Sequence, residues 1–157
     1  MRCDVRAVGR LKAGPERALV DDWLARATAL GRSHGLGPFT EREIDPRSLK
    51  DKMAETRALL DGLAPGALVV ALDETGKNLG STCFSNLIAK ARDDGVREAA
   101  FLVGGADGHA RDLLPAGARL VSFGKATWPH MLARAMLAEQ LYRAVSLIAG
   151  TPYHREG

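Results

Sequence analysis

The sequence contains few of the residues that indicate a metal site, a disulfide framework or a membrane span. Its two cysteines, Cys3 and Cys83, are far apart and belong to no Cys-x-x-Cys or Cys/His spacing, so neither a zinc site nor a disulfide is encoded. We expect both to be buried as small apolar residues. No apolar run approaches the ~18 residues of a membrane span, and the residues after Met1 lack the apolar segment of a signal peptide. These absences predict a cytoplasmic protein that uses no metal and does not enter a membrane.

Charge is also modest, with a net value of +3 in 157 residues. A value this small does not by itself indicate nucleic-acid binding, which requires a clustered basic face. The location of the excess is more informative, because the first 118 residues balance to zero. The excess comes from the C-terminal segment, where five basic residues outnumber two acidic ones: Arg119, Lys125, Arg134, Arg143 and Arg155 against Glu139 and Glu156. We therefore expect a basic face in that segment.

The common phosphate-binding motifs are missing. A P-loop needs Gly-x-x-x-x-Gly-Lys-Ser/Thr, but Gly76-Lys77 and Gly124-Lys125 are followed by Asn78 and Ala126, and neither pair has the earlier glycine. The dinucleotide fingerprint Gly-x-Gly-x-x-Gly follows the first strand of its domain, whereas the glycine cluster of this chain begins at Gly104. The sequence therefore disfavours an ATP-binding P-loop and an ordinary nicotinamide domain.

The apolar residues recur with periods that predict alternating strands and helices. Two segments, 67–72 and 99–103, are continuous apolar runs, which is the pattern of strands buried on both faces of a parallel sheet. The full set of predicted strands is 2–8, 39–44, 67–72, 99–103 and 118–123, and the predicted helices are 15–31, 46–63, 81–95, 109–114 and 130–149. Ser81 is expected to cap its helix. The alternation predicts an α/β fold, a mainly parallel sheet flanked by helices, in a single domain over 1–157.

Three loops follow neighbouring strands of this sheet, at 73–77, 104–108 and 124–128. In open α/β sheets ligands bind beyond the carboxyl ends of the strands, and glycines there allow close approach of the backbone. The clustering of these loops indicates a nucleotide-like ligand. Taken alone, Gly104-Gly105 is equally well explained as a tight turn from strand to helix.

The C-terminal helix and the tail after it each allow two interpretations. Helix 130–149 is apolar over more than one face, which indicates either a position deep in its own core or contact with a second subunit. The tail holds Tyr153, His154 and Arg155, a combination that suits proton removal and phosphate recognition. A short terminal tail is also commonly inert.

Several segments together resemble one family, the RlmH-type ribosomal RNA methyltransferases of the SPOUT superfamily. The matching segments are Ala7-Val8-Gly9-Arg10-Leu11-Lys12, LDETGKNLGSTCFS at 72–85, FLVGGADGH at 101–109, SFGKATWPHMLARAMLAEQLYRA at 122–144 and GTPYHR at 150–155. They cover essentially the whole chain, and the last two are the most specific. Small departures occur at Trp128, where Phe or Leu is more usual, and at Gly124-Lys125.

The resemblance implies a trefoil-knotted α/β domain, a homodimer, and S-adenosylmethionine as methyl donor. It further implies methylation of N3 of a pseudouridine in 23S ribosomal RNA within the ribosome. The residues that it places at the donor are Leu72, Gly105, Gly124, Lys125, Ala126, Thr127 and Trp128. It also implies that Tyr153, His154 and Arg155 complete the site from the partner subunit.

Our hypothesis for the reaction is that the donor loops orient the methyl group while His154 or Tyr153 helps to remove the N3 proton. Arg155 and the basic C-terminal face would hold RNA phosphate. Two other classes of function remain as alternatives: a non-catalytic ribosome-binding or RNA-binding protein that has kept the fold, and a nucleotide-binding oxidoreductase. The intact tail disfavours the first, and the late glycine cluster disfavours the second.

Overall fold

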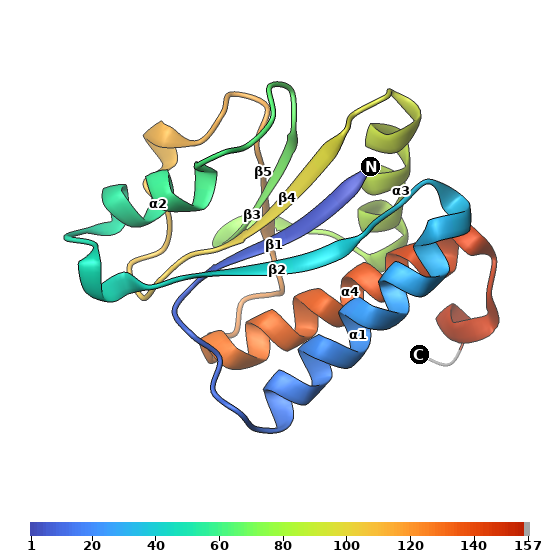
Figure 1. Cartoon of the computed structure of the whole chain (residues 1–157), viewed down its shortest axis with the longest axis horizontal. Helices are drawn as coiled ribbons and strands as arrows, with labels where there is room; N and C mark the ends of the chain where they lie inside the picture. Colours follow the sequence, from blue (N-terminus) through green and yellow to red (C-terminus); the bar gives the residue numbers. More distant parts are fainter. Residues whose placement is uncertain (156–157) are drawn as a thin grey trace.

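A five-stranded sheet forms the centre of the protein, whose computed structural model describes residues 1–155 apart from the side chains of His154 and Arg155 (Figure 1). The strand order is β2-β1-β4-β3-β5, and every neighbouring pair is parallel. The strands are β1 (Arg2–Val8), β2 (Phe39–Ile44), β3 (Leu68–Asn78), β4 (Glu98–Val103) and β5 (Arg119–Ser122). The predicted α/β fold with a mainly parallel sheet is confirmed.

Helices cover both faces of this sheet (Figure 1). Helices α1, α3 and α4 pack against one another on one face, whereas α2 lies on the other. The four α-helices are α1 (Pro15–Gly31), α2 (Lys52–Leu60), α3 (Ser81–Asp93) and α4 (His130–Ala149). Short 3-10 turns occur at η1 (Arg32–His34), η2 (Pro46–Ser48), η3 (Arg111–Leu113) and η4 (Pro152–Arg155).

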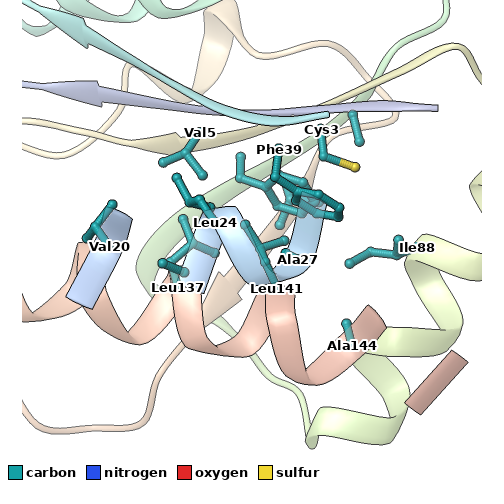
Figure 2. Packing of buried hydrophobic residues seen from close by; sticks show 14 of the residues in the cluster. Cys3, Val5, Val20, Leu24, Ala27, Phe39, Ile88, Leu137, Leu141 and Ala144 are labelled. Atoms are coloured by element: carbon teal, nitrogen blue, oxygen red, sulfur yellow. The ribbon is translucent and has the colours of Figure 1, made fainter. Parts of the chain in front are cut away.

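The larger part of the core lies between the sheet and helices α1 and α4. Figure 2 shows Val5 and Phe39 of the sheet facing Leu24 of α1 and Leu137 and Leu141 of α4. Every residue of β4 is buried, as its continuous apolar run predicted for a central strand. A second, smaller cluster on the opposite face packs beneath α2. Helix α4 is therefore largely a core element, although its first turn is exposed.

Several local expectations were wrong. The helix expected over 46–63 is two pieces, because Asp51 caps a new helix by accepting a hydrogen bond from the Ala54 amide at 2.8 Å. Ser81 is the first residue of α3 and not its cap, since its hydroxyl donates to the Gln140 side chain at 2.9 Å. Cys83 is exposed because it lies on the outer side of α3, whereas Cys3 is buried as expected. The predicted helix over 109–114 is only the short turn η3.

The segment predicted as a loop at 73–77 belongs to β3. The strand pairs with β5 at Leu72, bulges outward, and pairs again from Lys77, so both residues face Val121. Gly76 lies where the returning segment touches β5: a Cβ atom there would be 2.6 Å from the Leu120 carbonyl carbon. Because backbone atoms cannot move aside cheaply, only glycine fits this position.

Arg134 of α4 is buried instead of contributing to a basic surface. Its side chain is 1% exposed and binds the Glu41 carboxylate and, at 2.7 Å, that of Glu43. It also donates to the Gly9 carbonyl at 3.1 Å, while Glu43 accepts a hydrogen bond from the Leu11 amide at 2.7 Å. This buried ion cluster joins α4 to the edge strand β2 and fixes the chain where it leaves β1. The basic surface of the C-terminal segment is correspondingly smaller than expected.

Removing Arg134 from this cluster should be costly. Arg134→Met would leave Arg17, which also pairs with Glu41 and Glu43, as the cation beside these carboxylates, so we expect the free energy of unfolding to fall by about 1–3 kcal/mol. Urea denaturation measures the change. The control is Lys90→Met, which removes an exposed pair with Asp94 and should cost less than about 1 kcal/mol. Equal effects of the two substitutions would contradict this account of Arg134.

Candidate functional site

A cavity of about 710 Å³ lies at the carboxyl ends of four strands. Its apolar lining includes Val8, Val103 and Val121, at or near the ends of β1, β4 and β5, and Leu72, which precedes the bulge of β3. Its rim is made by the loops that follow these strands and by the first turn of α4. This is the position at which open parallel sheets bind ligands.

Six of the seven residues expected at the methyl donor line this one cavity. They come from three separate parts of the chain: Leu72, Gly105, Gly124, Ala126, Thr127 and Trp128. Lys125, the seventh, is exposed and does not line the cavity. The structure therefore brings the three predicted loops together, although the first of them is the bulge of β3.

The loop after β5 is held by its own hydrogen bonds. The Ser122 hydroxyl donates to the Gly124 carbonyl at 2.9 Å, and the Trp128 indole N–H donates to the Phe123 carbonyl at 3.2 Å. Gly124 has a φ of +105°, a conformation that other residues rarely adopt. These contacts hold the loop that lines one side of the cavity.

The Glu55 carboxylate of α2 lies directly over Gly105. A Cβ atom on Gly105 would be 2.5 Å from the Glu55 Oε2 atom, so glycine leaves room for this carboxylate. Burial raises the pKa of Glu55, as do the negative charges of Asp107 and Asp51, although a hydrogen bond from the Gly105 amide opposes the shift. Glu55 therefore belongs to the wall of the cavity.

The carboxylates and ammonium or guanidinium groups of a cavity lining determine which ligand charge it attracts, and here only carboxylates are present among the described residues. Among the described residues that line it, Glu55, Asp73 and Glu74 are acidic and none is lysine or arginine. Asp73 is neutralised by Arg111 at 2.7 Å. Although burial acts in the opposite direction, hydrogen bonds from Thr75 and Arg111 lower the pKa of Asp73. A cavity of this kind suits a ligand that carries positive charge.

Two histidines with lowered pKa values border the site. His109 is buried with its Nε2 atom 3.1 Å from the Leu72 carbonyl oxygen, and burial lowers its pKa. His130, at the start of α4, lines the cavity; burial and the charge of Arg134 lower its pKa. Its Nε2 atom is buried without a partner among the described residues, and its side chain caps no helix. His130 is thus available to a ligand.

The described part of the tail lies away from this cavity. Tyr153 packs against Trp23 of α1 and Tyr142 of α4, and the Arg143 guanidinium lies 4.9 Å from its ring centre. Its hydroxyl donates to Glu139 at 2.9 Å. Burial and this carboxylate raise the pKa of Tyr153 to about 12. The side chains of His154 and Arg155, also expected at the site, lie outside the described residues.

Two site residues were missed by the reasoning from sequence. Glu55 is one of several acidic residues in a polar stretch, and no local pattern separates it from the others. The position of His130 after Trp128-Pro129 at a helix start predicts an interface or capping residue, so reasoning from sequence did not place it at the site. No three described His, Cys, Asp or Glu side chains are grouped as a metal ion would need. In the described part of the chain, no helix is long and apolar enough to cross a membrane.

Comparison with known proteins identifies the family of this chain. A family described as predicted SPOUT methyltransferase matches residues 1–154. A protein of Maricaulis maris named ribosomal RNA large subunit methyltransferase H is 60% identical over 156 residues, which is 99% of this chain and all of the relative. Proteins with the same name from Hyphomonas neptunium and Dinoroseobacter shibae are 49% and 48% identical, with 99% of each chain covered. The resemblance seen in the sequence is thus confirmed, and the chain belongs to the SPOUT methyltransferase family.

Proposed function

We propose that this methyltransferase transfers a methyl group from S-adenosylmethionine to N3 of a pseudouridine in 23S ribosomal RNA within the ribosome. The observation that carries the proposal is the single cavity at the ends of four parallel strands, into which six expected donor residues converge. The relatives' name supports ribosomal RNA of the large subunit as the substrate. A protein with this substrate acts in the cytoplasm, where bacterial ribosomes are.

The cavity fits the proposed donor in size and chemistry. Its volume of about 710 Å³ is in the range of small-molecule sites. The apolar lining suits the adenine ring, and the exposed backbone of the loops can hydrogen-bond to adenine and ribose. The carboxylates of Glu55 and Glu74 complement the positive charge of the donor. Bound S-adenosylmethionine supplies a methyl group that is already activated by its attachment to positively charged sulfur.

The remaining task of the protein is to align N3 of the base and to accept its proton. Tyr153 is poorly suited as the proton acceptor, because its raised pKa keeps the hydroxyl protonated and donating to Glu139. We therefore assign proton removal to His154, whose ordinary pKa lies near neutrality. Tyr153 anchors the tail through its contacts with Trp23, Tyr142 and Glu139. Arg155 is assigned to RNA phosphate.

The tail completes the site of a partner subunit in this proposal. Within one chain, Tyr153 bonds to Glu139, which lies about 14 Å along α4 from His130 at the cavity. A tail held there does not line its own cavity. The first turn of α4 and the loop before it expose large apolar side chains, Trp128, Met131 and Leu132. Such a patch beside the cavity suits contact with a second copy of the chain, which makes the protein a homodimer.

The function is tested by incubating the protein with S-adenosylmethionine labelled in the methyl group. Ribosomes, separated subunits and naked 23S RNA are offered in parallel. We expect label in 23S RNA from ribosomes, and mass spectrometry of nucleosides should find it on N3 of pseudouridine. Binding to ribosomes without transfer of label would favour the non-catalytic alternative. Affinity for a nicotinamide cofactor and none for S-adenosylmethionine would favour the oxidoreductase.

The role of the tail is tested by a chain that ends at Gly150. Because Tyr153, His154 and Arg155 are absent from it, we expect turnover to fall at least ~100-fold while donor affinity stays within about twofold. Single-turnover assays and calorimetry measure the two quantities. Methylation at the unchanged rate would remove the tail from the mechanism.

The donor site is tested by Gly105→Val, whose side chain must displace Glu55 and narrow the cavity. We expect the affinity for S-adenosylmethionine to fall at least ~10-fold, equivalent to about 1.4 kcal/mol. Gly117→Val is the control, because the space around Gly117 is open and it lines no part of the cavity. Undiminished binding by Gly105→Val would exclude Gly105 from the site.

These two variants together decide which subunit supplies the tail. In a mixed dimer, the shortened chain supplies an intact cavity and the Gly105→Val chain supplies an intact tail. These two parts form one complete site only if the tail acts in the partner subunit. At a donor concentration too low for Gly105→Val to methylate RNA, restored methylation on mixing the two proteins supports action across the dimer. No restoration in a mixed dimer that has been shown to form would place the tail in its own subunit.

A further inference from the structure

We infer that Glu55 is a specificity-determining residue that makes the cavity prefer the positively charged methyl donor over the neutral product left after transfer. The inference rests on the proposed function and extends it to the selection between donor and product. Its basis is the position of the Glu55 carboxylate, its lack of a neutralising partner, and the contrast with the two other acidic residues of the lining.

Contacts hold both the backbone and the side-chain carboxylate of Glu55 in place. Its backbone belongs to the first turn of α2. There the Asp51 side chain caps the helix by accepting from the Ala54 amide, and the Glu55 amide donates to the Asp51 carbonyl at 3.0 Å. Its carboxylate occupies the space over Gly105, with the Gly105 amide facing it. The negative charge is thus held at the middle of the glycine-rich wall.

The charge of Glu55 is not compensated within the described structure. No described lysine, arginine or histidine nitrogen lies within 4.0 Å of it, whereas Asp73 pairs with Arg111 at 2.7 Å. Its acidic neighbours Asp107 and Asp51 add to the negative potential. Glu74 also lines the cavity but is exposed, so water screens its charge. Of the three acidic residues in the described lining, Glu55 is therefore the one that is neither paired with a cation nor exposed.

The chemistry of the two ligands makes this charge selective. In the transfer, N3 of the base gives its proton to the acceptor assigned above, its electron pair forms the new N–C bond, the S–C bond breaks, and the electron pair of that bond stays on sulfur. S-adenosylmethionine thereby becomes S-adenosylhomocysteine and loses its sulfonium charge, while the rest of the molecule is unchanged. A nearby carboxylate attracts the donor more strongly than the product. The consequence is tighter donor binding and easier product release.

The test compares three ligands by calorimetry in the full-length protein and in Glu55→Gln. The ligands are S-adenosylmethionine, S-adenosylhomocysteine and sinefungin, an analogue that carries an ammonium group in place of the methylsulfonium. Glutamine keeps the size of the side chain and an acceptor for the Gly105 amide. We expect Glu55→Gln to bind both cationic ligands ~5–10-fold more weakly and S-adenosylhomocysteine within about twofold of the unchanged protein.

Two further variants control for charge and for folding. Glu16→Gln on α1 makes the same change in net charge away from the cavity, and all three affinities should stay unchanged. Glu55→Ala removes the carboxylate without placing an amide over Gly105, and it should reduce the preference for cations in the same direction. It provides the measurement if Glu55→Gln does not fold.

The outcomes separate this inference from the proposed function. Equal weakening of all three ligands by Glu55→Gln would indicate a packing role and overturn the inference, as would an unchanged ratio of donor to product affinity. Where only Glu55→Ala can be measured, an unchanged ratio overturns it likewise. If the unchanged protein binds none of the three ligands, the proposed donor site fails, and the inference fails with it.

Discussion

The parallel direction of all five strands is the constraint on which the candidate site depends. Parallel strands bring their carboxyl ends to one edge of the sheet, so residues as far apart as Val8 and Val121 meet at one cavity. The loop glycines acquire a role only because the sheet places them together. The ion cluster around Arg134 maintains this edge, since it binds the Gly9 carbonyl where the chain leaves β1 and ties β2 to α4.

Features that depend on local periodicity could be predicted from the sequence. A strand buried on both faces must be apolar throughout, and β4 shows this pattern from Ala99 to Val103. The donor loops follow from the same reasoning, because glycines after buried strands mark the edge where ligands bind. The resemblance to a known family then identified which residues of those loops face the cavity, and the structure places all but Lys125 there.

Features that depend on distant partners could not be predicted in this way. Arg134 reads as a surface charge until β2 is known to supply Glu41 and Glu43 beside it. Ser81 has the sequence of a helix cap, but Gln140 offers its hydroxyl a partner on another helix. Glu55 lies fifty residues from the loop that it covers. The trefoil knot, which the resemblance alone implies, stays a prediction.

In the proposed mechanism, donor binding and proton removal make opposite demands on a site, and the groups assigned to them lie at different positions along α4. A carboxylate that attracts a cationic donor would also raise the pKa of a histidine beside it and keep that histidine protonated. His130, next to the cavity, instead has a lowered pKa because it is buried and faces Arg134. The tail is anchored at Glu139, away from the acidic lining of its own cavity. In the proposed dimer, the proton acceptor of a second subunit meets the acidic cavity only when the substrate assembles the two halves of the site.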